Sequence, residues 1–391
     1  MRILMLLDRV FPQDERVEKE IRSLMEAGNE VRIATYSFEE TEFQDNSQGY
    51  IIYRKKIGGW MYKFGAAVLV LPFYLNFWRH YTRDIYRVWN FEAIHIHDLP
   101  MARVGVEYKR KHGILFIADQ HELYSSWIVQ NAHYHTPTGK VVSMLSNWVA
   151  YERKCLSKAD LVCTVEEPLR AIYLENFRLQ PEKVIVIPNT PLRTIYQVES
   201  KSKIHKNLNL FYCGGMDILR GLDTVIESLV LLKEEIPEIR LVLVGRKNKH
   251  FDPQSYAESM GVGELIEFRG WVDYRELPHE IDRSDICFFT PPTDREEIHN
   301  TIATKIYQYM ARGKPVIVGS ARYMKEFVEA HEIGISIDEK SSKEFADAIR
   351  KMYQNPDLYK RYSENATRLI EQFYWEETVG DLLNFYQDQN R

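Results

Sequence analysis

Short runs of apolar residues alternate along the whole chain with longer stretches in which apolar positions recur at helical spacing. The strand-like runs of the first half are 2–7, 30–36, 93–97, 114–119, 161–165 and 184–189. Those of the second half are 208–215, 240–245, 266–270, 285–290, 314–319 and 334–338. Strands that alternate with helices predict parallel sheets covered by helices on both faces. We therefore expect an α/β protein with two doubly wound, Rossmann-like sheets.

The alternation pauses between the two halves. After Asn189 the chain is polar, with Pro191 and a group of lysines, which is typical of a linker. The pattern predicts a first domain over residues 1–192, a linker over 193–206 and a second domain over 207–370. Ligands of doubly wound sheets bind at the carboxyl ends of the strands, so we expect the site in a cleft between the two domains.

Composition narrows the class of protein. A chain of 391 residues is too long for one ordinary core and suits two domains. Its 45% hydrophobic and 27% charged residues are typical of a folded soluble protein, and its net charge of -5 argues against nucleic acid as a partner. The cysteines include no C-x-x-C pair, which favours reduced thiols in a cytosolic core over disulfides or a zinc site. They are Cys155, Cys163, Cys213 and Cys287.

The longest apolar run, residues 64–77, has 14 residues and contains Pro72, whereas about 20 residues are needed to span a bilayer. It lies in a segment that begins at Trp60, ends at Trp89 and joins aromatic bulk to basic residues. Such a composition is typical of a helix on an anionic membrane surface, but packed core helices with solvent-facing basic residues would show the same pattern. The start of the chain has no signal-peptide cleavage site, so we expect a cytoplasmic protein. The basic residues are Lys63, Arg79, Arg83 and Arg87.

The stretch YCGGMDILRGLDTVI combines features that suit a phosphate. A strand ends at Gly214 and Gly215, a short loop follows, and a helix begins near Gly221. The first turn of a helix presents free N–H groups and a positive dipole to an anion, and the guanidinium of Arg220 suits a two-pronged phosphate contact. A tight turn with a solvent-facing Arg220 is the alternative. The stretch contains neither a GxGxxG fingerprint nor a Walker loop.

Several stretches, taken in order, resemble retaining glycosyltransferases of family 4, which have the GT-B fold. The donor-binding half is matched by GGMDILRGLDTVIESL, RLVLVG, IEFRGWV, ELPHEIDRSDICFFTP and KIYQYMARGKPVI. The first half continues the resemblance through DERVEKEIRSLMEAGNEVRIATY, IHIHDLP and ADQHELY. FYWEETVGDLLNFY is similar to the closing helix of the family, which implies that residues 371–391 cross back to the first domain.

The resemblance implies an enzyme that moves a hexose-type sugar from a nucleoside diphosphate to an acceptor hydroxyl, with retention of the anomeric configuration. The first domain would bind the acceptor, and the second would bind the nucleotide sugar. The family generally works without a metal, so no metal or other cofactor is expected.

In this family an E-x7-E pattern precedes the Gly-Lys-Pro turn. The register of YMARGKPVI puts Asn300 at the first Glu and Gln308 at the second, where the family holds the nucleotide ribose. Gln308 can still accept and donate hydrogen bonds but loses charge assistance, so weaker ribose binding is expected. The resemblance places backbone N–H groups around Asn300, Thr301 and Ile302 against the sugar or the diphosphate.

The resemblance also implies how phosphate and base are held. Family members often carry an Arg where this chain has Met216, which leaves Arg220 as the cation of the loop. Lys305 lies one helical turn before Gln308, and we expect it to supply the missing charge, a solvated helix lysine being the alternative. Base recognition, mainly by backbone groups, is expected near Arg246, Trp271 and Val272.

The stretch HIHDLP ends a strand of the first half. Alternation puts His95 and His97 on one face, with His97 at the carboxyl end and facing the expected cleft. The resemblance places such a His beside the transferred sugar, with Asp98 adjacent. Two alternatives are a metal held by His95, His97 and Asp98, for which no further ligand is identifiable, and a histidine bonded to a backbone carbonyl.

Two further stretches concern the acceptor side. ADQHELY ends the next strand, so His121 and Glu122 also reach the carboxyl edge, and acceptor binding is their expected use. Asp14 and Arg16 match a D-x-R-V version of the first loop of the family, and Arg16 would either enter the cleft or cap the helix that it starts.

The sequence thus predicts a glycosyltransferase with His97, Arg220 and Lys305 as its catalytic residues. Its expected role is in the assembly of a cell-surface polysaccharide or glycolipid, with a saccharide or lipid-linked acceptor. If the segment 60–89 binds membrane, a lipid-linked acceptor and a peripheral position on the cytoplasmic face of a membrane would follow. Because three charged positions of the family are uncharged here, two alternatives stay open. One is a nucleotide-binding partner protein without catalysis, and the other is a GT-B epimerase that acts on the nucleotide sugar itself.

Overall fold

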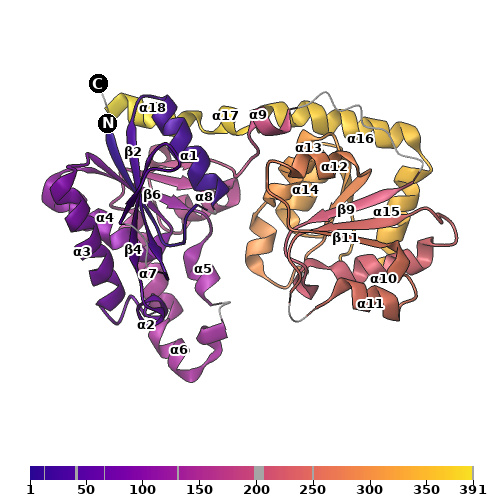
Figure 1. Cartoon of the computed structure of the whole chain (residues 1–391), viewed down its shortest axis with the longest axis horizontal. Helices are drawn as coiled ribbons and strands as arrows, with labels where there is room; N and C mark the ends of the chain where they lie inside the picture. The colour runs from indigo at the N-terminus through magenta and orange to yellow at the C-terminus, as the bar shows by residue number, and fades with distance from the viewer. Residues whose placement is uncertain are drawn as a thin grey trace. The chain divides into compact units, whose positions relative to one another are not determined.

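The computed structural model describes residues 1–12, 14–39, 43–65, 67–129, 132–197, 207–248 and 251–389. The chain divides into two compact units, Met1–Pro188 with Val379–Arg391, and Asn189–Thr378 (Figure 1). The divisions fall near the expected positions but not at them. Residues 193–206 were expected to be linker, yet Arg193–Tyr196 form a short helix, α9, of the second unit. Residues 198–206 lie outside the described residues.

The first unit contains a sheet of eight strands in the order β3-β4-β2-β1-β5-β6-β7-β8. All neighbours are parallel except β3 and β4. The pattern predicts six of these strands but not β3 or β4, because the apolar residues of β4 are followed at once by three basic residues. The strands are β1 (Arg2–Leu7), β2 (Glu30–Ser37), β3 (Gln44–Asp45), β4 (Ile51–Lys56), β5 (Ala93–His97), β6 (Leu115–Gln120), β7 (Leu161–Thr164) and β8 (Val184–Val186).

Helices cover both faces of this sheet. One core joins α3, α4, α7 and α8 to the sheet through residues such as Trp78, Trp148 and Tyr173, and Figure 1 shows α3 and α4 near each other. Helices α1 and α18 cover the opposite face, where Glu20 and Tyr386 meet β5. The helices are α1 (Glu15–Glu26), α2 (Gly59–Lys63), α3 (Phe73–Val88), α4 (Ala102–His112), α5 (Tyr124–Ile128), α6 (Pro137–Val142), α7 (Leu145–Leu156), α8 (Glu167–Glu175) and α18 (Gly380–Gln389).

Helix α3 contains most of the aromatic segment that the sequence left open between core and membrane surface. Its inward side chains, among them Trp78 and Tyr81, have no exposed surface, so the core interpretation is correct for this helix. Arg79 is bonded to Glu107 of α4, with 2.8 Å between Nε and Oε2. Helix α2 differs, because none of its residues is buried and Trp60 is 82% exposed. Among the described residues, no helix is long and apolar enough to cross a bilayer.

The second unit contains a parallel sheet of six strands in the order β11-β10-β9-β12-β13-β14, and the sequence pattern predicts all six. The prediction of two doubly wound sheets is therefore confirmed. Helices α10 and α11 lie on one side of the second sheet, and α12 and α13 lie on the other (Figure 1). The strands are β9 (Asn209–Cys213), β10 (Arg240–Val244), β11 (Ile266–Gly270), β12 (Ile286–Phe289), β13 (Val316–Val318) and β14 (Gly334–Ser336).

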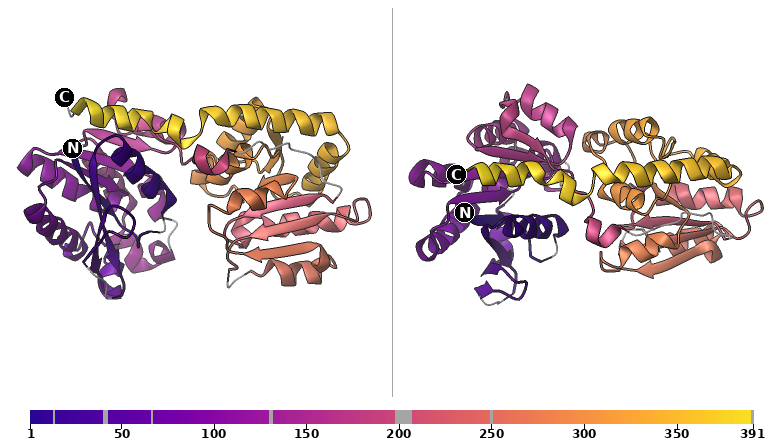
Figure 2. Two further views of the ribbon diagram at one scale, coloured as in Figure 1. Left: turned by 45° about the horizontal axis from the view of Figure 1, so that its top comes forward. Right: turned by 90° about the horizontal axis from the view of Figure 1, so that it is seen from above.

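The chain returns from the second unit to the first through α17 and α18, at the yellow end of the chain in Figure 2. The four cysteines are free and buried, as the sequence predicts. The remaining helices of the second unit are α10 (Leu222–Leu232), α11 (Pro253–Ser259), α12 (Leu277–Asp282), α13 (Thr304–Ala311), α14 (Arg322–Ala330), α15 (Ser342–Tyr353), α16 (Pro356–Leu369) and α17 (Trp375–Thr378).

Candidate active site

Three neighbouring strands of the second sheet end at a glycine. Strand β9 precedes Gly214, β10 precedes Gly245 and β11 ends at Gly270, with φ angles of 142°, 142° and 73°. The N–H of Gly245 donates to the carbonyl of Gly270 at 2.8 Å. A Cβ atom on Gly245 would lie 1.9 Å from the carbonyl oxygen of Gly214. Position 245 therefore requires glycine, because the backbone of Gly214 approaches too closely for any side chain.

Lys305 of α13 lies against the same edge. Its ammonium is 4.4 Å from the ring centroid of Tyr212 and 4.5 Å from that of Phe289. A Cβ atom on Gly214 would be 2.8 Å from Nζ. Burial, and in addition the charge of Arg220, lowers the pKa of Lys305 to about 8. No carboxylate among the described residues forms an ion pair with this lysine, so its charge is available to an anionic ligand.

Arg220 immediately precedes Gly221, after which α10 begins. No side chain in the described part of the chain caps α10, so the N–H groups of its first turn are free to bind a ligand. The Nε of Arg220 and the Oγ1 of Thr290 are buried and lack a hydrogen-bond partner among the described residues. A Cβ atom on Gly221 would be 3.1 Å from that hydroxyl. Unsatisfied buried polar groups are rare, so these atoms point to a ligand at the start of α10.

The loop before α13 carries the residues expected to face the donor sugar. The side-chain amide of Asn300 donates to the carbonyl of Glu296 at 3.2 Å, within a 3-10 turn that spans Glu296–Asn300. Thr301 is half-buried, and Ile302 is 4% exposed. On α13 itself Gln308 is 6% exposed and lies one turn beyond Lys305, the relation that the sequence predicts.

Arg246 and Trp271 form an exposed pair beside the glycine edge. The guanidinium of Arg246 lies 5.6 Å from the ring centroid of Trp271, which is 62% exposed, and Val272 is half-buried against the core. Met216 is fully buried, and its N–H donates to the carbonyl of Arg246 at 3.1 Å. The position that often carries an Arg in the resembling family is thus a core position here, which explains its lack of charge.

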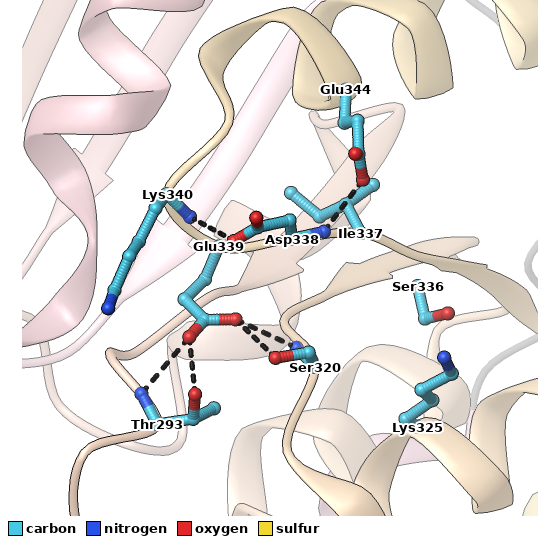
Figure 3. A pocket seen from close by; sticks show the side chains of 9 residues that line it. All are labelled: Thr293, Ser320, Lys325, Ser336, Ile337, Asp338, Glu339, Lys340 and Glu344. Carbon is cyan, nitrogen blue, oxygen red and sulfur yellow. Dashed lines mark hydrogen bonds between the residues drawn. The ribbon is translucent and has the colours of Figure 1, made fainter.

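A cavity of 490 Å³ opens at the carboxyl ends of β13 and β14 (Figure 3). Its lining includes Glu339, which is 4% exposed and accepts hydrogen bonds from Thr293 and Ser320. Reasoning from the sequence did not single out Glu339. The available signal was its place directly after the strand-like run 334–338, at the edge where ligands of such sheets bind.

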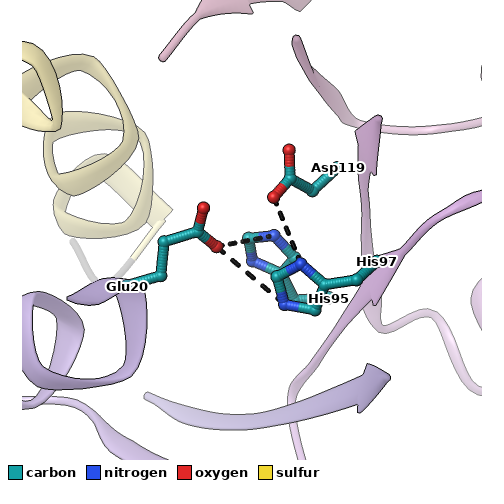
Figure 4. A group of neighbouring side chains, drawn as sticks. All are labelled: Glu20, His95, His97 and Asp119. Carbon is teal, nitrogen blue, oxygen red and sulfur yellow. Dashed lines mark hydrogen bonds and ion pairs between the residues drawn. The ribbon is translucent and has the colours of Figure 1, made fainter. Parts of the chain in front are cut away.

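In the first unit, His95 and His97 lie on one face of β5, as alternation predicts, and Ile94 and Ile96 on the other face belong to the core. The two histidines have no exposed surface, and Glu20 of α1 points toward both (Figure 4). His97 Nδ1 lies 3.2 Å from Asp119 Oδ2, and His95 Nδ1 lies 3.1 Å from the hydroxyl of Tyr386. The expectation that His97 faces a cleft is therefore wrong, because His97 has no exposed surface and α1 and α18 cover this face.

Arg16 belongs to the same buried network. Its guanidinium contacts Asp119 (Nη2 to Oδ1, 3.0 Å) and Glu20 (Nε to Oε1, 3.1 Å). The cap of α1 is Asp14, so neither expected role of Arg16, in the cleft or as a cap, is correct. Burial would raise the pKa of Asp119, but the charges of Arg16 and then of His121 hold it well below its usual range. Arg16 thus compensates the buried carboxylate of Asp119, whereas burial and the negative charge of Asp119 raise the pKa of Glu20 well above its usual range.

The same network contains four groups of the kind that bind metals. Glu20, His95, His97 and Asp119 each place one ligand atom within 4.8 Å of the others. A single ion needs lone pairs that converge on one point about 2 Å from each ligand. The rings of His95 and His97 are stacked, with 18° between their planes and 4.9 Å between centroids, so their lone pairs lie in two nearly parallel planes instead of converging on one point. With Arg16 already beside both carboxyl groups, we interpret the group as a buried polar network that joins α1 to the sheet.

Above this network, three of the predicted acceptor-side residues gather at the carboxyl edge of β5 and β6. His121 is 13% exposed, and its Nε2 lies 3.2 Å from Asp119 Oδ2. Burial opposes its charge, but the carboxylates of Asp98 and Asp119 raise the pKa of His121 above its usual value. Asp98 has a φ of 66° and accepts a hydrogen bond from Arg9 at 2.9 Å. Glu122 is half-buried beside them.

Asp8 and Arg9 extend this edge, and sequence reasoning did not single them out. The hydroxyl of Tyr74 donates to Asp8, and burial raises the pKa of Asp8 to about 7. The signal that could have found them is topological. Asp8 and Arg9 directly follow β1, which lies next to β5, and the carboxyl ends of neighbouring parallel strands share an edge.

Two family patterns match nearly the whole chain in succession. The pattern described as Glycosyltransferase Family 4 matches residues 16–190, and the pattern described as Glycosyl transferases group 1 matches residues 197–369. The chain belongs to this glycosyltransferase family.

This glycosyltransferase is 22% identical over 322 residues to EpsD of Bacillus subtilis strain 168, a glycosyltransferase by name, with 78% of each chain covered. Its fold is similar to that of sucrose-phosphate synthase from Thermosynechococcus elongatus, with a TM-score of 0.74, 16% identity and coverage of 99% and 98%. Anabaena HepE in complex with UDP-glucose has a TM-score of 0.66 and 17% identity, with both chains fully covered. The GT-B fold that the sequence predicts is confirmed.

Within this glycosyltransferase the predicted site residues divide into two groups. The structure brings Gly214, Gly221, Arg220 and Lys305 together at one edge of the second sheet. Asp98 and His121 meet at one edge of the first sheet. Each group therefore lies within a single unit.

Proposed function

We propose that this glycosyltransferase uses a nucleoside diphosphate sugar as donor and holds the diphosphate at the start of α10, between Arg220 and Lys305. The observation that carries the proposal is the convergence of unsatisfied polar groups at this point. Arg220 Nε and Thr290 Oγ1 are buried and lack partners among the described residues, and the ammonium of Lys305 lies against Gly214. Two cations and the free N–H groups of a helix N-terminus suit a pair of phosphates.

In the proposed reaction the diphosphate is the leaving group. The bond between the anomeric carbon and the phosphate oxygen breaks, and the negative charge that grows on the diphosphate is stabilised by Arg220 and Lys305. The oxygen of the acceptor hydroxyl bonds to the anomeric carbon, and the hydroxyl proton passes to the departing diphosphate. We propose attack from the face that the diphosphate leaves, with retention, as the family resemblance implies. No metal or other cofactor is proposed, because the two side chains supply the positive charge.

The remaining parts of the donor follow from this placement. Trp271 offers an exposed aromatic face to the nucleobase, with Arg246 and Val272 beside it. Gln308 can serve the ribose through its carbonyl and NH2 groups. The backbone of Asn300, Thr301 and Ile302 is proposed to meet the sugar. HepE was solved with UDP-glucose, so UDP-glucose is the first donor to test.

We propose that the acceptor binds at the carboxyl edge of the first sheet, where Asp98, His121 and Glu122 gather. Carboxylates accept hydrogen bonds from hydroxyl groups, and the imidazole of His121 donates or accepts, so the edge suits a saccharide. Because His97 is buried beneath this edge, its proposed contribution is to hold Asp119, which in turn contacts His121.

The nature of the acceptor is proposed from four exposed residues at and after α2, which we call the α2 patch: Trp60, Lys63, Val70 and Phe73. Trp60 is 82%, Val70 56% and Phe73 49% exposed, and Lys63 adds a positive charge. Aromatic side chains beside a basic residue suit an anionic membrane surface. We therefore propose a lipid-linked saccharide as acceptor, on the cytoplasmic face of a membrane, in the assembly of a cell-surface polysaccharide or glycolipid.

The proposal is tested with a panel of UDP-, GDP- and ADP-sugars, followed by product analysis with and without saccharide acceptors. For the active donor, Arg220→Ala should lower kcat/KM about 10²- to 10³-fold. Arg361→Ala removes an exposed arginine of the same unit and should leave kcat/KM unchanged. An Arg220→Ala variant as active as the wild type would show that the diphosphate does not bind at this position.

The same panel separates the alternatives. Nucleotide binding without turnover of any donor would indicate a binding protein without catalysis. A changed sugar in the absence of acceptor would indicate an epimerase.

A further inference from the structure

We propose that Glu339 is a positioning residue, which fixes the loop of residues 290–303 between β12 and α13 and thereby sets how this loop meets the donor sugar. The inference rests on the proposed function for the identity of the ligand. Its structural part, the fixing of the loop, stands on contacts within the second unit alone.

The carboxylate of Glu339 accepts four hydrogen bonds, two at each oxygen (Figure 3). Oε1 accepts from the N–H and the hydroxyl of Thr293, at 3.2 and 2.5 Å. Oε2 accepts from the N–H and the hydroxyl of Ser320, at 3.1 and 2.6 Å. Thr293 follows β12, Ser320 follows β13 and Glu339 follows β14, so one side chain joins the ends of three neighbouring strands.

Thr293 is held by a third contact as well. His299 Nε2 lies 3.0 Å from the carbonyl oxygen of Thr293, while His299 Nδ1 accepts the N–H of Arg322 at 3.2 Å. Because Nδ1 accepts, Nε2 carries the proton and donates to Thr293. The first half of the loop is therefore fixed to the start of α14 and to Glu339 before the chain reaches Asn300.

The charge of Glu339 strengthens these bonds. Burial alone would raise the pKa of this carboxyl, but the hydrogen bonds from Ser320 and Thr293 outweigh it and lower the pKa to about 2. The contribution of Glu339 to stability is thus present above the usual carboxyl pKa near 4.5 and is lost only as pH falls toward about 2. Each bond to the ionised carboxylate is charge-assisted throughout the neutral range.

The position of Glu339 links it to the anion site. A Cβ atom on Gly319 would lie 3.1 Å from Glu339 Cβ and 3.5 Å from the Cα of Thr290. Thr290 begins the loop, and its unsatisfied hydroxyl lies beside Gly221 at the start of α10. The loop ends next to Lys305. Glu339 therefore fixes a segment whose two ends both belong to the proposed diphosphate site and whose middle carries the residues proposed to meet the sugar.

The test compares Glu339→Gln and Glu339→Asp with Glu344→Gln, a matched change of an exposed carboxylate in the same cavity. Glu344 accepts the N–H of Asp338 at 2.8 Å, a bond that the side-chain oxygen of a glutamine can keep. A glutamine at this position offers only one acceptor oxygen. Its NH2 group would face the backbone N–H of Thr293 or of Ser320, and a backbone N–H can donate a hydrogen bond but cannot accept one. We expect Glu339→Gln to lower kcat/KM for the donor sugar about 10- to 100-fold, mainly through kcat. Binding of the nucleoside diphosphate alone, which lacks the sugar, should change less than about twofold. Glu339→Asp should restore part of the loss, and Glu344→Gln should show none.

Hydrogen exchange provides a second readout that requires no turnover. Amides of residues 293–303 should exchange faster in Glu339→Gln than in the wild type, with Glu344→Gln unchanged. If Glu339→Gln does not fold, Thr293→Val, which removes one hydroxyl, replaces it in both measurements.

The outcomes separate the two proposals. A wild type that turns over no nucleotide sugar contradicts the proposed function, whereas unchanged exchange in the loop contradicts the fixing of the loop by Glu339. Equal losses of nucleoside diphosphate binding and of turnover would show a general disturbance of the site and would overturn the positioning role.

Discussion

Lys305 carries its charge in surroundings that favour the neutral amine. Two aromatic rings lie close to its ammonium, Arg220 adds a second positive charge, and no carboxylate of the described chain pairs with it. Desolvation is the largest cause of its lowered pKa, which is about 8. A bound diphosphate would favour the charged form, so we infer that the ligand and the proton bind this lysine together.

This coupling predicts a pH dependence of donor binding. Below about pH 8 Lys305 is already charged, so binding needs no proton uptake; above it, each bound diphosphate must bring a proton. The affinity for the nucleoside diphosphate should therefore fall as pH rises above 8, by up to about tenfold per pH unit. Isothermal titration calorimetry between about pH 7 and 9 measures this affinity. Lys305→Met should bind weakly without this dependence, and a flat wild-type profile would contradict the assignment.

At the scale of elements, the glycine edge of β9, β10 and β11 explains how backbone alone shapes the proposed donor site. Glycines at strand ends are visible in the sequence, because YCGG, LVLVG and IEFRG each end a strand-like run. Their close approach is not visible there, since it depends on the parallel pairing of three strands. The structure shows that Gly245 leaves no room for a side chain against Gly214.

Gly245→Ala should therefore destabilise the second unit. An alanine held at a φ of 142° is expected to lower the free energy of unfolding by about 1–3 kcal/mol. The steric clash of its Cβ with the carbonyl of Gly214 should lower it further. Differential scanning calorimetry of the full chain should show a lower unfolding temperature. Gly215→Ala is the matched control, because nothing lies within 4 Å of its added Cβ and its φ is not in the positive region. Equal stability of the two variants would refute the argument.

At the scale of the whole molecule, each unit has its own core, and the two proposed ligand edges lie on different units. The α2 patch belongs to the first unit, which carries the proposed acceptor edge. The structure also indicates which basic residues are accessible to a membrane surface. Arg79 is bonded to Glu107, whereas Lys63 is exposed at the end of α2.

Membrane binding should accordingly depend on the α2 patch. The wild type is expected to co-sediment with anionic phosphatidylglycerol vesicles, and Trp60→Ala with Lys63→Glu should reduce the bound fraction several-fold. Leu231→Ala, which removes an exposed apolar residue of the second unit, is the control and should bind like the wild type. A wild type that stays in the supernatant would exclude the α2 patch as a membrane surface.

The sequence by itself determined the two doubly wound sheets, the helix of residues 304–311 and the candidate residues at strand ends. It could do so because periodicity records which side of an element is buried, and because glycines and helix starts act over a few residues. The face shared by His95 and His97 and the pairing of Lys305 with Gln308 on one helix face belong to this local kind of information.

Only the tertiary structure decided which of these residues stay accessible. His97 is covered because Glu20 and Tyr386 meet its strand, and Tyr386 lies 291 positions from His95. Arg16 pairs with Asp119 across 103 positions, and Glu339 reaches Thr293 across 46. Such contacts form where elements far apart in the chain pack together. The hydrophobic pattern of one element does not identify the element that packs against it. For this physical reason the sequence predicted the strand ends, while the packing decided which side chains they offer to a ligand.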